Sequence, residues 1–343
     1  MKALVLKEFG RVAVEMLPDA TAGRGEVLIE IVATGICGSD IHGFTGDNGR
    51  RIPGQVMGHE TVGRIVDLGP GTEDSGLEVG QVATFNPVVV SEEDAITYRG
   101  REQHSPDKKV IGVATDIISA FSQLIAVPLR NVVPLPSDIP IEYGALVEPL
   151  AVALHAVRRA GVRAGQRVLV VGGGPIGQSV VLALRMEGVT EILVSEVEPA
   201  RRALVECLGV RAIDPAGGPV VELVTASFGG LADVSLDAVG LEATLADALA
   251  STRFGGSVAL VGMGSKSLRF DAFRVSTEER TIVGSFTYSA QDFSDAAAWV
   301  ATGPAVVGEL ISREVALADA NEAFLALAGN DGTAGKVLVR LDL

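Results

Sequence analysis

One junction limits the possible folds of this chain more than any other feature: a short apolar strand that leads directly into glycines. Residues 167–171 read RVLVV, and Gly172, Gly174 and Gly177 follow in the spacing GxGxxG. Glycines in this spacing allow a tight turn and let backbone amides reach a pyrophosphate at the start of a helix. The junction therefore predicts a doubly wound parallel sheet of the Rossmann type.

An acidic residue at the end of the next apolar run supports this prediction. Glu196 follows ILVS at the distance from the glycines that dinucleotide-binding folds use. A carboxylate there accepts hydrogen bonds from ribose hydroxyls and repels a 2′-phosphate, which favours NAD. Arg201 and Arg202 could pair with a phosphate, so NADP stays open as the less favoured cofactor. The predicted cofactor-binding residues are Gly172, Gly174, Pro175, Ile176, Gly177, Glu196 and Arg201.

The pattern of apolar residues along the chain changes near residue 167. Before it, short β-branched runs broken by Gly and Pro predict short antiparallel strands at 26–34, 61–68 and 81–85. After it, apolar strands alternate with amphipathic helices, which is typical of βαβ units. The predicted elements here are helices at 175–187 and 199–208, a strand at 257–262, helices at 290–301 and 317–328, and a final strand KVLVRL.

Composition excludes several classes of function. The 343 residues are 48% hydrophobic, enough for two cores, and a net charge of −15 opposes binding to nucleic acid or anionic membranes. The start MKALVLKEFG lacks a signal-peptide core, and the longest apolar stretch, 168–184, is interrupted by Gly and Pro. Two cysteines make no disulfide framework. We therefore expect a cytoplasmic protein without nucleic-acid or membrane partners.

A set of unlike metal-ligand residues predicts chemistry. Cys37 and His42 lie in CGSDIH, His59 and Glu60 in GHE, and Glu148 in ALVEPL. Thiolate, imidazole and carboxylate together suit Zn²⁺, and three protein ligands leave the fourth position open for water or substrate. This is the pattern of a catalytic metal site.

The motifs GICGSDIH, GHETVG, ALVEPLAVALHAV, VLVVGGGPIG and AGKVLV resemble, in order and spacing, the zinc-dependent medium-chain dehydrogenases of the alcohol dehydrogenase superfamily. The closest branch is that of sorbitol and butanediol dehydrogenases. The resemblance implies an α/β protein: a GroES-like β-rich catalytic domain at 1–147, completed by 287–343, and a Rossmann domain at 148–286. It also implies a secondary alcohol, diol or polyol as substrate.

The resemblance assigns the metal ligands. Cys37 and His59 resemble the family's first two zinc ligands. Glu60 resembles a carboxylate that is a ligand in the sorbitol branch, and Glu148 stands where other alcohol dehydrogenases have a second cysteine. The third protein ligand is therefore either Glu60 or Glu148.

Four more residues receive roles from the resemblance. Ser39 resembles the hydroxyl that touches the substrate oxygen, and His42 the group that passes the proton outward, for which a pKa near operating pH is suitable. Asp40 is predicted to orient a metal-bound ligand. Lys336 resembles a basic residue near the carboxylates.

The chain departs from the family at two places. The four cysteines of a structural-zinc lobe are replaced by Ser91, Asp94, Thr97 and Ser105, which predicts one catalytic zinc, no structural zinc, and a lobe that is hydrogen-bonded and packed or else mobile. Thr287 replaces an arginine of sorbitol-type enzymes, which argues against sorbitol itself. A smaller diol, a cyclitol, a sugar derivative or a simple secondary alcohol stays open.

Other residues and interpretations complete the predictions. His155 and Cys207 are predicted to be core residues, and His104 has no assigned role. The strands at 257–262 and TIVGSF could form a sheet edge that pairs across a two-fold axis, so a homodimer or homotetramer is expected. The alternative functions are a metal-free quinone or enone reductase of the same superfamily and a non-catalytic dinucleotide-binding sensor.

Overall fold

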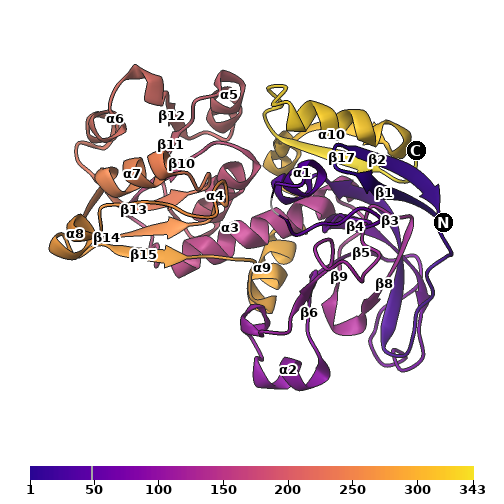
Figure 1. Cartoon of the computed structure of the whole chain (residues 1–343). Helices are drawn as coiled ribbons and strands as arrows, with labels where there is room; N and C mark the ends of the chain where they lie inside the picture. Colours follow the sequence, from indigo (N-terminus) through magenta and orange to yellow (C-terminus); the bar gives the residue numbers. More distant parts are fainter. Residues whose placement is uncertain (48) are drawn as a thin grey trace. The chain divides into compact units, whose positions relative to one another are not determined.

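The computed structural model describes residues 1–47 and 49–343, which form two compact units. Unit 1 comprises Met1–Glu148 and Ser289–Leu343, and unit 2 comprises Pro149–Tyr288. The indigo and yellow ends of the chain in Figure 1 both belong to unit 1. Unit 1 is therefore completed by the C-terminal segment, which follows unit 2 in the sequence.

Unit 2 is built on a six-stranded parallel sheet. Its order is β12 (Arg211–Ile213), β11 (Glu191–Ser195), β10 (Arg167–Val171), β13 (Ala232–Asp237), β14 (Thr252–Leu260) and β15 (Thr281–Gly284). The chain moves outward from β10 to β12, returns to β13 and continues to β15. This reversal is the switch point of a doubly wound sheet, at which dinucleotides bind in such folds.

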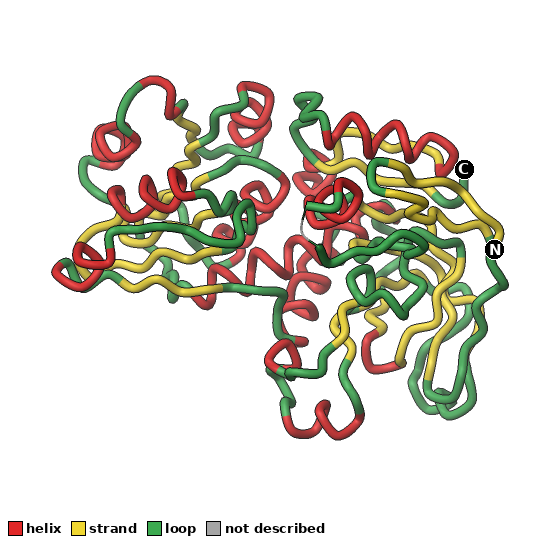
Figure 2. Tube along the Cα trace, viewed as in Figure 1, coloured by secondary structure: helices red, strands yellow, loops and turns green. Residues whose placement is uncertain are grey.

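Helices alternate with these strands, as Figure 2 shows. They are α4 (Pro175–Met186), α5 (Pro199–Cys207), η4 (Pro215–Gly217), α6 (Val220–Phe228), α7 (Glu242–Ser251) and α8 (Ala272–Thr277). Because a parallel sheet has helices on both faces, its strands are apolar throughout, and Val168, Leu169 and Val170 of β10 are fully buried. Burial of each such side chain contributes about 1.5–3 kcal/mol. This core holds the glycine turn after β10 in place.

Unit 1 contains a seven-stranded, mostly antiparallel sheet. Its order is β16 (Ile311–Ala316), β17 (Lys336–Arg340), β3 (Glu26–Gly35), β4 (Glu60–Leu68), β5 (Val82–Phe85) and β9 (Val132–Pro134), with β8 (Leu124–Pro128) also paired to β3. Leu338 of β17 is opposite Gly35 of β3, which is opposite Glu60 of β4. Three segments far apart in sequence therefore meet where β3 ends.

Smaller elements complete unit 1. They are the hairpin β1 (Lys2–Glu8) and β2 (Arg11–Met16), α1 (Gly38–Thr45), the pair β6 (Val88–Val89) and β7 (Lys109–Val110), α2 (Glu92–Thr97), η1 (Glu102–His104), η2 (Leu129–Asn131), η3 (Ile141–Leu146), α9 (Ala290–Val300), η5 (Ala305–Leu310), η6 (Leu317–Asp319) and α10 (Ala320–Ala328). Helix α3 (Val147–Arg159) begins in unit 1 and continues in unit 2. The rings of Phe44, Phe121 and Phe324 pack together and join α1 to α10. This packing fixes the helix that follows Cys37.

Three details differ from the sequence-based expectation. The predicted helix 317–328 is a 3₁₀ turn followed by a shorter α-helix, and the strand predicted at 257–262 begins at Thr252. β15 is a sheet edge, but β14 lies inside the sheet between β13 and β15. Within the described part of the chain, no helix combines the length and the apolar composition that a membrane span requires.

Candidate functional site

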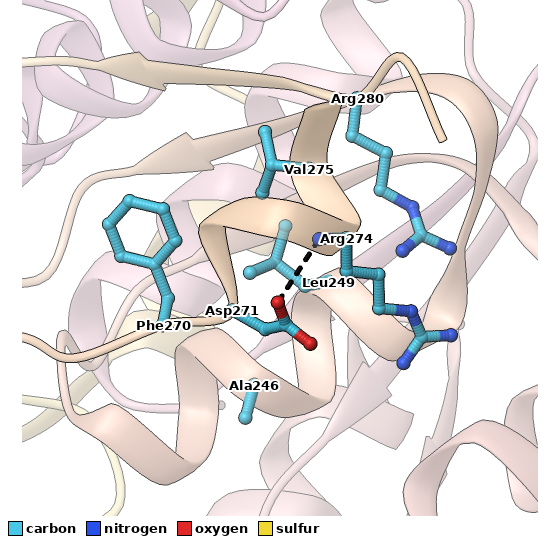
Figure 3. Close-up of a pocket in the computed structure, with 7 residues that line it drawn as sticks. All are labelled: Ala246, Leu249, Phe270, Asp271, Arg274, Val275 and Arg280. Carbon is cyan, nitrogen blue, oxygen red and sulfur yellow. Dashed lines mark hydrogen bonds between the residues drawn. The ribbon is translucent and has the colours of Figure 1, made fainter. Parts of the chain in front are cut away.

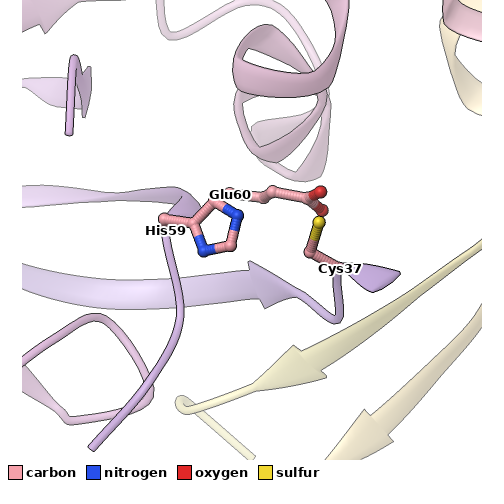
Figure 4. Close-up of side chains that lie close together, drawn as sticks. All are labelled: Cys37, His59 and Glu60. Carbon is pink, nitrogen blue, oxygen red and sulfur yellow. The ribbon is translucent and has the colours of Figure 1, made fainter. Parts of the chain in front are cut away.

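Three side chains of the ligand types that bind metals lie together in unit 1. A ligand atom from each of Cys37, His59 and Glu60 lies within 4.8 Å of the other two, and Figure 4 shows the thiol and the carboxylate side by side with the imidazole next to them. Cys37 precedes α1, and His59 and Glu60 stand where β4 begins. Because β3 and β4 pair without a register shift from Ala33 opposite Val62 to Gly35 opposite Glu60, the end of the sheet brings the Cys37 loop next to the start of β4.

Asp40 connects two members of this cluster. Its Oδ2 accepts a hydrogen bond of 3.1 Å from the backbone amide of Cys37, and its Oδ1 lies 3.8 Å from Nδ1 of His59. The carboxylate thus faces one ring nitrogen and leaves Nε2 of His59 for a metal. Second carboxylates of this kind commonly set the ring orientation of metal-bound histidine, which is the role predicted for Asp40.

Glu60 is paired with Lys336. The lysine Nζ lies 2.8 Å from Oε1 and 2.7 Å from Oε2 of Glu60, and both side chains are buried. Burial alone would lower the pKa of Lys336, but the charge of Glu60 raises it above its ordinary value. A Cβ at Gly35 would collide with Oε2 of Glu60 and lie 3.2 Å from Cδ of Lys336. Glycine at this position leaves the space that the ion pair occupies.

Glu148 lies near the cluster without belonging to it. The side chain is 7% exposed at the start of α3, and its charge raises the pKa of both His59 and Lys336. The structure therefore groups Glu60, rather than Glu148, with Cys37 and His59. Glu148 is nevertheless close enough to interact electrostatically with His59 and Lys336.

The electrostatics of the cluster fit a divalent cation. Burial lowers the pKa of His59, but the negative charges of Asp40, Cys37 and Glu148 and a hydrogen bond to Cys37 raise it to about 10. In the metal-bound state, with a neutral His59 and a thiolate at Cys37, the cluster would hold four anions (Cys37, Asp40, Glu60 and Glu148) and two buried cations (Arg51 and Lys336), which leaves two negative charges for one Zn²⁺ to neutralise. Buried polar atoms without a hydrogen-bond partner among the described residues include Ser39 Oγ, Asp40 Oδ1 and His59 Nδ1, whereas Glu60 Oε2 is paired with Lys336. The donor set of thiolate, imidazole and carboxylate fits bound zinc.

The two residues predicted for proton transfer are both on α1. Ser39 is in the first turn, directly after the loop of Cys37, and its Oγ is buried. His42 is one turn further along, and its side chain is exposed. Residues three apart lie on neighbouring positions of a helix surface, so α1 connects a buried hydroxyl to an imidazole in contact with solvent.

The glycine turn of unit 2 has the backbone that the motif requires. Gly172 has φ +97°, and a Cβ at Gly177 would collide with the carbonyl oxygen of Gly172. Glu196 lies across this turn: its Oε2 accepts a hydrogen bond of 2.6 Å from the Gly173 amide, and its Oε1 accepts one of 2.7 Å from the Glu198 amide. The carboxylate is thereby fixed beside the start of α4, where Pro175 and Ile176 form the first turn.

The two arginines after Glu196 differ in their surroundings. Arg202 donates to the Glu196 carbonyl at 2.8 Å and pairs with Asp214 at 2.9 Å. Arg201 lies over the glycine turn, with Nη1 3.9 Å from where a Cβ of Gly174 would stand, and its Nε is buried without a hydrogen-bond partner in the described chain. Of the two, Arg201 is therefore the one available to a cofactor.

The lobe that lacks the four cysteines is hydrogen-bonded. Ser91 caps α2 by accepting the Asp94 amide at 3.0 Å. Ser105 donates to Oδ2 of Asp94 at 2.6 Å and accepts the Asp107 amide at 3.2 Å. Among residues 1–47 and 49–343, Cys37, His59 and Glu60 form a group of three side chains that could hold a metal ion. No such group is found among the described residues of the lobe.

The structure can be compared with the sequence-based predictions for several further residues. Cys207 is exposed, so its prediction as a core residue is wrong: of the residues of α5 only Val205 is buried, and Cys207 lies at the helix end. His155 is 7% exposed, as expected for a core residue. Arg51 and Gly35, both beside the metal cluster, were missed. Glycine in a strand can indicate close backbone approach, but no periodic pattern distinguishes Arg51 from its exposed neighbour Arg50.

Two further features lie in unit 2. Thr287 has φ +52°, which is strained for a β-branched residue, and its hydroxyl donates to the Phe286 carbonyl at 2.7 Å. A cavity of about 110 Å³, shown in Figure 3, contains none of the predicted site residues. Its guanidinium groups are paired within the protein, Arg274 with Glu278 at 2.8 Å and Arg280 with the Thr252 carbonyl. The cavity is lined by Ala246, Leu249, Phe270, Asp271, Arg274, Val275 and Arg280.

Comparison with protein families matches both units. Residues 23–137 match the alcohol dehydrogenase GroES-like domain, and residues 175–302 match the zinc-binding dehydrogenase domain. These matches confirm the two domain types predicted from the sequence. They also support a zinc ion and a nicotinamide cofactor.

Two curated relatives are named as dehydrogenases of L-galactonate and of sorbitol. The chain is 33% identical to L-galactonate-5-dehydrogenase of Escherichia coli over 304 residues, which is 88% of each chain. It is 31% identical to sorbitol dehydrogenase 1 of Saccharomyces cerevisiae over 353 aligned positions, covering 98% of this chain and 97% of the relative.

Two solved structures share the whole fold. The 2R,3R-butanediol dehydrogenase of Bacillus subtilis aligns with a TM-score of 0.89 and 29% identity over 99% of both chains. A zinc-binding dehydrogenase of Sinorhizobium meliloti bound to NADP aligns equally well, also with a TM-score of 0.89 and 29% identity over 99% of both chains. The first is named as a dehydrogenase of butanediol, and the second shows that a similar chain binds NADP.

Proposed function

Because the chain belongs to the zinc-dependent medium-chain dehydrogenases of the alcohol dehydrogenase superfamily, we propose that it oxidises a secondary alcohol, diol or polyol to a ketone with NAD as hydride acceptor. The observation that carries this proposal is the cluster of Cys37, His59 and Glu60. Unit 1 is the proposed catalytic domain, and unit 2 the proposed dinucleotide-binding domain.

Cys37 and His59 would hold one zinc ion together with Glu60 or Glu148. When bound, zinc supplies a Lewis acid that lowers the pKa of a coordinated hydroxyl group. Asp40 keeps His59 in the orientation that presents Nε2, and Lys336 holds the Glu60 carboxylate. These contacts preorganise the ligands, so that little rearrangement precedes the reaction.

The proton of the substrate hydroxyl leaves along α1. Ser39 provides a buried hydroxyl that both accepts and donates, and His42 provides an exposed base whose imidazole exchanges protons with solvent. In this proposal Ser39 contacts the substrate oxygen, and His42 carries the proton outward.

Glu196 supports NAD as the preferred cofactor. Its carboxylate is fixed at the glycine turn by the amides of Gly173 and Glu198, where it would accept ribose hydroxyls and repel a 2′-phosphate. Arg201 is close enough to the turn to contact a phosphate. Since a similar chain binds NADP, the two cofactors need to be compared directly.

The substrate class follows from the relatives and from one departure. The names of the relatives point to polyols and sugar acids. Thr287 offers one hydroxyl where the sorbitol branch is expected to have an arginine, which favours a smaller diol, a cyclitol or another sugar derivative. A homodimer or homotetramer that pairs through the β15 edge is the proposed assembly.

A substrate screen tests the function. Zinc-loaded protein is incubated with NAD or NADP and a panel of diols, cyclitols, polyols and sugar acids, and nicotinamide absorbance is recorded. We expect reduction of NAD with at least one panel member and no turnover after chelation. Turnover of quinones or enones by metal-free protein would instead indicate the metal-free reductase, and cofactor binding without any turnover would indicate the sensor.

A further inference from the structure

A buried arginine beside the metal cluster has no role in the proposed reaction. Arg51 is 2% exposed, although it lies in the segment between α1 and β4. Its Nη2 is 3.7 Å from Oδ1 of Asp40, which is completely buried. Burying a guanidinium is costly unless the charge is paired, and Asp40 is the acid that faces it.

A glycine of α1 leaves room for the Arg51 side chain. A Cβ at Gly43 would collide with Cγ of Arg51 and would lie 3.2 Å from its Cβ and 3.2 Å from Sδ of Met57. Gly43 is inside α1, where glycine lowers helix stability relative to alanine. Glycine stands where α1 and the Arg51 side chain approach each other most closely. The sequence of α1 therefore leaves the space that this side chain occupies.

Asp40 relates Arg51 to two metal ligands. One oxygen of Asp40 accepts the Cys37 amide at 3.1 Å, and the other lies between Arg51 and the His59 ring, 3.7 Å and 3.8 Å away. A histidine that binds a metal is neutral. In the metal-bound protein Arg51 is therefore the charged partner of this oxygen.

We propose that Arg51 is a positioning residue of the metal centre, which acts through Asp40 to fix the backbone of Cys37 and the ring of His59 and thereby strengthens zinc binding. This inference rests on the proposed zinc-dependent function. It assigns Arg51 no contact with substrate, cofactor or metal.

The sign of the effect separates positioning from simple electrostatics. Removing a positive charge near a divalent cation would by itself tighten zinc binding, because like charges repel. Removing a residue that holds Asp40 in place would weaken it, since residues that orient metal ligands commonly contribute about 10–100-fold to metal affinity.

The test measures the zinc dissociation constant by competition with a chromophoric chelator. We expect Arg51→Met to weaken binding about 10–100-fold and Arg51→Lys to weaken it less. In the Asp40→Asn background, Arg51→Met should cause little further loss, because the connecting carboxylate is already changed. Arg50→Met is the matched control, since it removes an exposed charge from the neighbouring position and should change the constant less than about twofold.

A second readout reports the geometry of the site. The visible absorption bands of Co²⁺-loaded protein should shift in Arg51→Met toward those of Asp40→Asn. Unchanged or tighter zinc binding together with unchanged cobalt bands would overturn the inference. If Arg51→Met does not fold, the zinc dissociation constant of Arg51→Lys is the test. An unchanged zinc affinity in Arg51→Lys would then overturn the inference. Absence of zinc binding by the wild type would instead overturn the proposed function itself.

Discussion

The ammonium group of Lys336 lies 2.8 Å from one carboxylate oxygen of Glu60 and 2.7 Å from the other. One buried lysine thus holds both oxygens of a candidate zinc ligand. The two residues are brought together by β17, which pairs with β3 and reaches Gly35, the position opposite Glu60. The freedom of Glu60 to turn toward a metal therefore depends on a lysine near the other end of the chain.

Lys336→Met removes the cation and leaves a buried carboxylate unpaired. We expect a loss of about 3–5 kcal/mol in the free energy of unfolding of zinc-free protein. The loss should be smaller in zinc-loaded protein, because the ion neutralises the same carboxylate. Urea unfolding of both forms measures the difference, and Lys266→Met, at an exposed position of unit 2, is the control. Equal losses with and without zinc would show that Glu60 does not face the ion.

His59 should make the stability of zinc-free protein depend on pH. Its pKa of about 10 in the folded chain exceeds the ordinary value of 6.5, because Asp40, Cys37 and Glu148 outweigh the effect of burial. A raised pKa means that the proton stabilises the fold fully below pH 6.5, and that this contribution is lost as pH rises toward 10. The difference in unfolding free energy between wild type and His59→Leu should therefore shrink over this range. A difference that is constant from pH 6.5 to 10 would contradict the prediction.

Glu196→Ala should move cofactor preference toward NADP. The change removes the carboxylate that would repel a 2′-phosphate and leaves Arg201 beside the glycine turn. We expect the ratio of kcat/KM for NAD to that for NADP to fall at least about tenfold, mainly through KM, since a tenfold change needs only about 1.4 kcal/mol. Glu198→Gln, two residues away, is the control. A wild-type preference for NADP would refute the role given to Glu196.

The hydrogen bond between Ser105 and Asp94 should stabilise the lobe in place of a metal. Ser105→Ala removes a buried donor to a carboxylate, which typically costs about 1.5–3 kcal/mol. Faster proteolysis within residues 91–107 and a lower melting temperature would report this loss. Thr97→Ala, at an exposed position of the same lobe, should change stability by less than about 0.5 kcal/mol. A chelator that loosens the lobe of the wild type as much as Ser105→Ala does would indicate a second metal after all.

The parts of the fold that could be predicted are those with strong local signals. The glycine turn after β10 follows from the backbone that Gly172 and Gly177 require, and the alternation of strands and helices predicted the parallel sheet. The approach of Cys37 to His59 depends on β3 and β4 pairing in register. It was inferred from motif spacing, since a single sequence does not show the register.

The parts that could not be predicted depend on tertiary contacts. Arg51 and Arg50 are adjacent and chemically identical, yet only Arg51 is buried, because its partner Asp40 lies on another element. Cys207 was predicted from the average burial of cysteine, while its place at the end of α5 exposes it. The choice between Glu60 and Glu148 depends on side-chain reach, which motif spacing does not show.

Nicotinamide reduction by Cys37→Ser, compared with Cys207→Ser, tests the metal centre most directly. Each variant removes one thiol, from the cluster in the first case and from an exposed helix end in the second. With the best substrate of the screen, we expect wild type and Cys207→Ser to hold one zinc per chain and to turn over equally. Cys37→Ser should lose the zinc and slow by more than the roughly 10–100-fold that a residue outside the ligand set contributes. Wild-type turnover by Cys37→Ser without bound zinc would contradict a catalytic zinc at Cys37 and His59.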